Sequence, residues 1–157
     1  MKEQAMSKNT AIEKLKSGSK WIVVICILAI LFNLACIFRM FGHVRNIADP
    51  DPVITYVLIR EFITLGINIV IMALAAWMFL RISKEGMPFS AGNIRIVRIV
   101  GILFLVNAVI PSVVTGAVIT PFSIPNYTAL IEGLLFLFIA HIIRYGAMLQ
   151  QESDETL

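Results

Sequence analysis

The chain has 157 residues, a hydrophobic content of 59% and a formal net charge of +3, and its mean hydropathy is +0.88. A soluble domain is usually about 45–50% apolar, so this chain holds more apolar surface than one small water-soluble core can bury. Its basic residues flank apolar runs and do not form one clustered basic face, which argues against direct nucleic-acid binding. We therefore expect a single all-α integral membrane domain.

Four apolar segments are long enough to cross a bilayer as helices, for which about 20 mostly apolar residues are needed. The predicted spans are residues 21–38, 56–80, 99–119 and 127–145. The fourth is the weakest by hydropathy, because it must include Glu132 or run past Arg144 to reach this length. We expect a transmembrane domain over residues 21–149, between a basic segment 1–20 and a tail 150–157.

The distribution of Lys and Arg around the spans predicts their direction across the membrane. Basic residues are concentrated before the first span and between the second and third spans. They are Lys2, Lys8, Lys14, Lys16 and Lys20, followed by Arg81, Lys84, Arg95 and Arg98. The loop 120–126 carries no charge, although Arg39 and Arg45 near the first loop depart mildly from the rule. Both termini are therefore predicted to lie in the cytoplasm, with the protein in the cell membrane.

Local signals predict where the helices begin. Thr10 and Glu13 have the spacing of a capping box, so the N-terminal segment is either an amphipathic helix on the membrane surface or a disordered basic tail. The segment Asp49-Pro50-Asp51-Pro52 predicts a rigid extracellular turn before the second span. Ser90 is a candidate N-cap of the third span. The first apolar run is longer than the h-region of a signal peptide, so we expect no cleavage there.

Small and polar residues predict which side of each span packs inward, because hydrophobicity alone does not hold helices together in lipid. The four predicted inward faces are Cys26, Ala29, Asn33 and Cys36; Glu61, Asn68 and Ala75; Ala108, Ser112 and Gly116, with Gly101 and Thr115 nearby; and Glu132, Ile139 and Gly146. Together these faces predict a compact four-helix bundle. Asn33, Asn68 and Asn107 lie toward the middle of their spans, where they either hold the helices together or line a polar cavity for a ligand or ion.

Four charged residues are predicted to share one level in the outer leaflet. They are Arg39, Arg60, Glu61 and Glu132. Ionisable residues inside a span are costly and often functional. One hypothesis is an ion pair between Arg60 and Glu132 that locks the second span to the fourth. The alternatives are that these side chains reach to the headgroups, or that they form a substrate or proton site.

Signatures of catalysis are missing from the sequence, which has no phosphate-binding glycine loop, no GxSxG turn and no HExxH motif. The two histidines, His43 and His141, lie far apart along the chain, and the two cysteines fall within one apolar run. We therefore expect no enzyme activity, no cofactor, no metal site and no disulfide framework.

Two segments of the predicted cytoplasmic side resemble a known family. The first is Pro88-Phe89-Ser90 followed by Asn93, just before the third span, and the second is the C-terminal sequence from Gly146 to Leu157. In the second segment the resemblance lies in the glycine, in Leu149-Gln150, and in Glu152, Asp154, Thr156 and the final aliphatic residue. This pattern resembles DUF2975, a bacterial family of small four-span membrane proteins built on a domain of unknown function. Ser153 and Glu155 depart mildly from it.

The resemblance implies no activity and no catalytic residues, but it implies a small helix-turn-helix regulator as a candidate partner. Both segments would face the cytoplasm, where core packing does not account for a sequence pattern. We therefore expect a regulatory or interaction protein that binds a soluble partner through its cytoplasmic loop and tail. Two alternatives stay open, namely a small transporter or immunity-type protein that uses the outer-leaflet charges, and an accessory subunit of a membrane complex.

Overall fold

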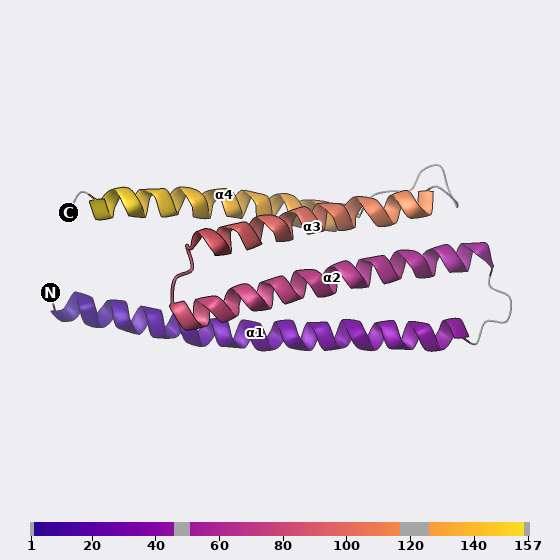
Figure 1. Ribbon diagram of the computed structural model, residues 1–157, viewed down its shortest axis with the longest axis horizontal. Helices are drawn as coiled ribbons and strands as arrows, with labels where there is room; N and C mark the ends of the chain where they lie inside the picture. Colours follow the sequence, from indigo (N-terminus) through magenta and orange to yellow (C-terminus); the bar gives the residue numbers. More distant parts are fainter. Residues whose placement is uncertain (1, 46–50, 117–125, 156–157) are drawn as a thin grey trace.

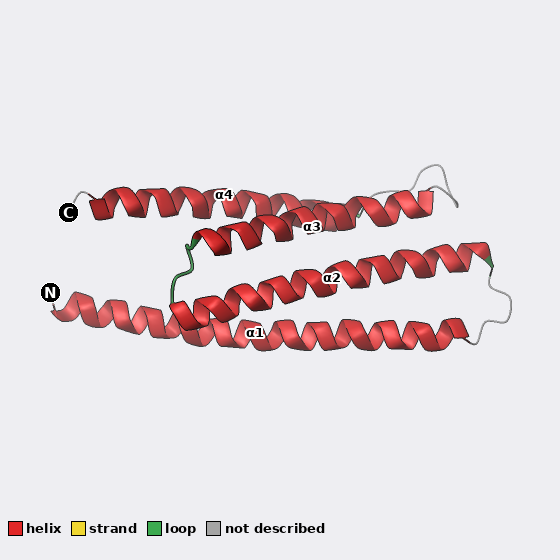
Figure 2. Ribbon diagram, viewed as in Figure 1, coloured by secondary structure: helices red, strands yellow, loops and turns green. Residues whose placement is uncertain are grey.

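In a computed structural model of the protein, the described part of the chain forms four helices (Figure 1). The structure describes residues 2–45, 51–116 and 126–155. The helices are α1 (Lys2–Arg45), α2 (Pro52–Glu85), α3 (Ala91–Gly116) and α4 (Tyr127–Glu155). Figure 2 shows that the described part of the chain is helical apart from its connections, as the all-α prediction requires.

All four helices are long and apolar enough to cross a membrane, over Ile12–Arg45, Val53–Glu85, Ala91–Val114 and Tyr127–Leu149. Their outward surfaces are apolar, and Phe32 and Phe38 of α1 are 71% and 75% exposed. Apolar patches of this extent are rare on soluble monomers, whereas lipid covers them without cost. The prediction of a four-span membrane protein is confirmed, including its weakest span, α4. The orientation of the termini stays a prediction.

The helices of this bundle pack in chain order. Contacts join α1 to α2, α2 to α3 and α3 to α4, and within the described residues no pair of Cα atoms within 8 Å joins any other two helices. The four helices therefore form two hairpins, α1–α2 and α3–α4, that meet through α2 and α3 (Figure 1).

Glycines set the close approach of α3 to α4. A Cβ atom added to Gly133 would lie 2.9 Å from the carbonyl oxygen of Gly101, and one added to Gly101 would lie 3.1 Å from that of Gly133. Ala108, Ala129 and Ala140 extend this contact, with exposures of 0%, 3% and 1%. Because small side chains let backbones approach, these residues define the packed faces of both helices.

The predicted inward face of α4 is therefore wrong. Glu132 and Ile139 are only half-buried, and Gly146 is exposed with nothing within 4 Å of its Cβ position. Side-chain size selects the packed face, which is centred one residue further along the chain, at Gly133.

The ends of the helices test the predicted caps. The Asp51 carboxylate accepts a hydrogen bond from the Val53 N–H at 2.9 Å, and Pro52 occupies the first helical position, where no N–H is needed. The Ser90 hydroxyl accepts from the Asn93 N–H at 3.3 Å, which confirms Ser90 as the N-cap of α3. Asp49 and Pro50 lie outside the described residues.

The predicted capping box at Thr10 and Glu13 is wrong, because α1 already begins at Lys2. Residues 2–20 are rich in straight-chain helix formers, so the helix runs through Thr10 and continues into the first span. The N-terminal segment is thus neither a separate surface helix nor a disordered tail. It extends α1 past the α2–α3 turn, where Ile12 and Lys16 face Gly86.

Candidate functional site

A pair of asparagines connects α2 to α3 inside the membrane. The Asn107 side-chain amide donates a hydrogen bond to the Asn68 side-chain oxygen at 3.5 Å, close to the upper limit for such a bond. Asn107 is 4% exposed, and its own side-chain oxygen has no hydrogen-bond partner within the described structure. This pair fixes the level at which α2 and α3 meet.

Asn33 does not join this pair. Its amide donates to the Ala29 carbonyl of its own helix at 2.7 Å, and α1 does not contact α3. The predicted polar core is thus reduced to Asn68 and Asn107, which act across one helix interface.

The first residues of α4 lie opposite the middle of α3. The Asn126 N–H donates to the Ala108 carbonyl at 3.2 Å, and the Asn126 side-chain oxygen accepts from the Ala129 N–H at 3.3 Å and so caps the helix. One turn beyond Ala108, α3 contains Pro111, which has no N–H to donate to the Asn107 carbonyl. Because α4 begins at this level, Glu132 lies deep in the bundle, next to the Gly101–Gly133 contact.

This register separates Glu132 from Arg60. Arg60 precedes Asn68 by eight residues, about 12 Å toward the end of the bundle where α2 begins. Glu132 follows Asn126 by six residues, about 9 Å in the opposite direction. The two side chains thus lie roughly 20 Å apart along the bundle axis.

The predicted ion pair between Arg60 and Glu132 is therefore not formed. Within the described residues the salt bridge found is Arg81–Glu85, at 3.4 Å on one face of α2. The predicted pair requires Glu132 to lie at the outer level of Arg60, whereas α4 begins level with Ala108 of α3. Glu132 consequently lies deeper than the outer-leaflet position predicted for it.

The other three charged residues of the predicted cluster lie at similar positions along the bundle axis. Phe41 and Phe62 are in ring contact, with centroids 4.9 Å apart, and this contact aligns the end of α1 with the start of α2. Arg39 precedes Phe41 by two residues, and Arg60 and Glu61 directly precede Phe62. Arg39 and Glu61 are exposed and Arg60 is half-buried, which is typical of side chains that reach the headgroup region.

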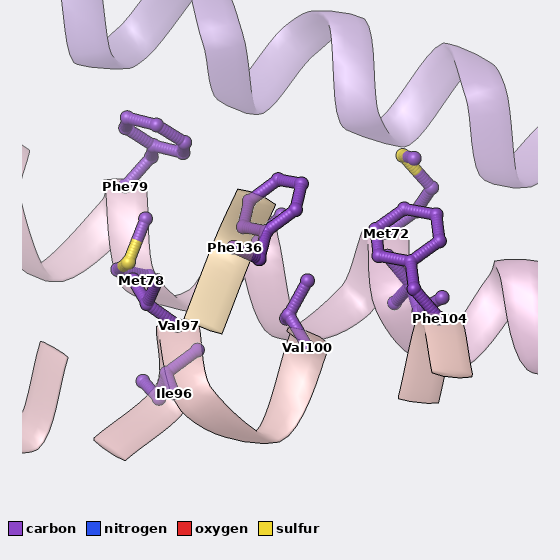
Figure 3. Close-up of a pocket in the computed structure, with 10 residues that line it drawn as sticks. Met72, Met78, Phe79, Ile96, Val97, Val100, Phe104 and Phe136 are labelled. Carbon is purple, nitrogen blue, oxygen red and sulfur yellow. The ribbon is translucent and has the colours of Figure 1, made fainter. Parts of the chain in front are cut away.

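A partly open apolar cavity of about 200 Å³ lies between α2 and α3, and Phe136 of α4 lines one side of it (Figure 3). Phe136 stacks on Phe104, with ring centroids 5.4 Å apart and planes at 19°. Met72, Met78 and Phe79 contribute further soft or aromatic surface, and no charged or polar side chain lines the space. The cavity depends on the offset of α4, so the sequence alone did not predict it.

The Pro-Phe-Ser…Asn segment builds the turn between α2 and α3. Gly86 ends α2 with a left-handed φ of 71°, a conformation that favours glycine. The Asn93 amide then donates to the carbonyls of Met87 and Pro88 at 3.1 and 3.2 Å, and Asn93 is 2% exposed. The Ser90 hydroxyl and the Asn93 amide nitrogen, which belong to residues predicted to bind a partner, thus make hydrogen bonds within the turn, while the Asn93 side-chain oxygen has no partner within the described residues.

The same turn presents two apolar side chains outward. Met87 is 64% exposed and Phe89 is 52% exposed, while Pro88 is half-buried. The turn lies outside all four candidate spans. The parts of α1, α2 and α3 on this side of the molecule carry exposed basic residues, namely Lys14, Lys20, Lys84, Arg95 and Arg98.

The C-terminal segment continues α4 as far as Glu155. Leu149 is 49% exposed, and Glu152 is exposed but has an interaction within the structure. The side chains of Gln150 and Asp154 and the whole of Thr156 lie outside the described residues. Of the predicted partner-binding residues, Phe89 and Leu149 are thus the apolar ones shown to be accessible.

The described residues contain no group of three or more His, Cys, Asp and Glu side chains placed to hold a metal ion. Residues 52–157, which comprise α2, α3 and α4, match the family model described as protein of unknown function (DUF2975). No curated protein matches the chain, and no solved structure does. The family match covers more than half of the sequence and agrees with the resemblance of the Pro88–Asn93 and C-terminal segments, so this four-span membrane protein belongs to the DUF2975 family.

Proposed function

We propose that this protein is an interaction protein of the cell membrane that binds a soluble cytoplasmic partner through the end of the bundle that carries the α2–α3 turn. The observation that carries the proposal is the exposure of Met87 and Phe89, at 64% and 52%, on a turn outside the apolar spans. Lipid covers exposed apolar side chains within the spans, whereas a turn outside them can present such side chains to a protein.

The turn is held rigidly enough to act as a recognition element. Ser90 and Asn93 fasten it to the first turn of α3, and Gly86 fixes the end of α2. A preorganised loop loses less conformational entropy on binding, so more of its contact energy appears as affinity. This favours a defined binding surface at Met87 and Phe89.

Charge indicates the chemistry of the partner. The exposed cations Lys84, Arg95 and Arg98 lie close to the turn in sequence, and the ends of α1 and α4 that carry the two termini lie on this side of the molecule (Figure 1). Complementary charge steers association and selects among partners. The partner surface is therefore acidic around an apolar centre, and the family resemblance makes a small helix-turn-helix regulator the candidate.

Co-purification tests the proposal. The tagged protein is extracted in a mild detergent, and the proteins that accompany it are identified by mass spectrometry. A Met87→Ser/Phe89→Ser double variant should lose a soluble partner that the wild type retains, and deletion of residues 150–157 should weaken the same capture. The matched control is Val53→Ser/Ile54→Ser, two residues at the opposite end of α2 that are 46% and 45% exposed.

The result that overturns the proposal is equal recovery of the same proteins with the wild type, the Met87/Phe89 variant and the control. All variants must also be recovered from the membrane fraction in wild-type amounts, so that a lost partner reflects a lost surface. The transporter alternative relied on the outer-leaflet charges Arg60, Glu61 and Glu132, and it stays a prediction.

A further inference from the structure

Glu132 is a carboxylic acid in the middle of the helix bundle. It is half-buried, and within the described structure it takes part in no ion pair. A charged side chain at this depth is costly unless it meets an opposite charge or a polar cavity. Lipid chains supply neither, so Glu132 is open to a ligand that carries positive charge.

Glu132 and the apolar cavity lie on the same side of α4. Glu132 precedes Phe136 by four residues, so the two side chains are neighbours one helical turn apart on one face. Phe136 enters the cavity and stacks on Phe104. In Figure 3 it lies between Phe79 on one side and Met72 with Phe104 on the other. The Cα atoms of Glu132 and Phe136 are thus separated by about 6 Å of helix rise.

The walls of the cavity suit an apolar group attached to a cation. Their aromatic faces, from Phe79, Phe104 and Phe136, attract positive charge, and the methionines Met72 and Met78 adapt to irregular shapes. The volume of about 200 Å³ is somewhat larger than the roughly 150 Å³ cavity that holds a benzene molecule. No basic side chain lines the cavity to compete for the carboxylate.

We propose that the cavity and Glu132 together form a binding site for a small apolar cation, with its aromatic or aliphatic group among Phe79, Phe104 and Phe136 and its charge neutralised by Glu132. A quaternary ammonium ion with one aromatic ring has the required chemistry. This site lies within the membrane and is independent of the partner surface at Met87 and Phe89, so each proposal can fail without the other.

Equilibrium binding of radiolabelled benzyltrimethylammonium tests the site. The purified full-length protein is used in micelles of an uncharged maltoside detergent, which adds no competing charge. Saturable binding is expected for the wild type. Glu132→Gln keeps the side-chain shape and removes the charge, so it should weaken binding by about tenfold or more. Ala75→Phe fills the cavity and should weaken binding similarly while leaving Glu132 in place.

Two controls separate the site from general charge attraction. Glu61→Gln removes an exposed acid near the start of α2 and should leave the dissociation constant within about twofold of the wild type. Tetramethylammonium, which carries the charge without the ring, should compete only weakly. The size-exclusion profile of each variant must match that of the wild type. If Ala75→Phe fails to fold, binding by the Glu132→Gln variant alone tests the proposal.

Three results would overturn the proposal. The first is unchanged binding by Glu132→Gln, and the second is no saturable binding to the wild type. The third is a tightly bound lipid chain, seen by native mass spectrometry, that occupies the wild-type protein and that benzyltrimethylammonium does not displace.

Discussion

The contact between Gly101 and Gly133 gives a sharp prediction about stability. In a Gly133→Ala variant the new methyl group would lie 2.8 Å from the side chain of Leu105 and 2.9 Å from the carbonyl oxygen of Gly101. The tip of a leucine can rotate, but the backbone oxygen of α3 cannot, so α4 must move away by several tenths of an ångström. Overpacking of this kind costs about 1–3 kcal/mol.

The comparison needs a control for helix propensity, because alanine favours the helix over glycine by about 1 kcal/mol. Gly66→Ala provides it, since Gly66 lies inside α2 and has nothing within 4 Å of its Cβ position. The propensity gain cancels between the two variants, so their free energies of unfolding should differ by about 1–3 kcal/mol. Reversible unfolding of each variant in mixed detergent and dodecyl sulfate micelles measures this difference.

A Gly133→Ala variant as stable as Gly66→Ala, within about 0.5 kcal/mol, would refute the close approach of α3 and α4 at this point.

Three further predictions concern the helix connections. A double-mutant cycle on Asn68→Ala and Asn107→Ala should give a coupling of about 0.6 kcal/mol, and zero coupling contradicts the hydrogen bond between them. Ser90→Ala should lose about 1 kcal/mol of capping and speed hydrogen exchange in the first turn of α3, and unchanged exchange there argues against the cap. Spin labels at the lipid-facing positions Ile59 and Ile131 should be separated by at least about 20 Å. A mean distance near 10 Å, the spacing of neighbouring helices at one level, would instead restore the predicted Arg60–Glu132 pair.

The spans and two helix starts could be predicted because their causes are local. A bilayer requires about 20 apolar residues in each helix, and this requirement is visible in hydropathy alone. Ser90 caps α3 within three residues of its own position. The Thr10 capping box failed because the same spacing occurs inside helices, and only the residues before Thr10 decide whether the helix starts there.

The relative level of α3 and α4 could not be predicted, because it depends on where two distant backbones approach most closely. Glu132, Ile139 and Gly146 repeat every seven residues, so they share a face as convincingly as the residues that actually pack. Ala129 and Gly133 form a small-xxx-small step that indicates the correct face. Side-chain size, more than polarity, therefore indicates which face of α4 packs against α3.

The candidate site combines predicted and unpredicted parts. Asn68 and Asn107 were recognised as polar residues deep in their spans, but their pairing depends on the register of α2 against α3. The cavity at Phe136 is lined by residues of three helices, so no local sequence pattern predicts it. The charge of Glu132 inside a span marks it as unusual in the sequence. Its separation from Arg39, Arg60 and Glu61 depends on the level at which α4 begins along α3, which the sequence does not indicate.

The central claim of a soluble partner at the α2–α3 turn is tested most directly by photocrosslinking in living cells. A photoreactive phenylalanine analogue replaces Phe89 on the turn or, for comparison, Phe38 on the lipid-facing side of α1, which are 52% and 75% exposed. We predict a discrete crosslink to a soluble protein from position 89 and none from position 38. Lipid adducts alone at position 89, or the same crosslinked proteins from both positions, would contradict the claim.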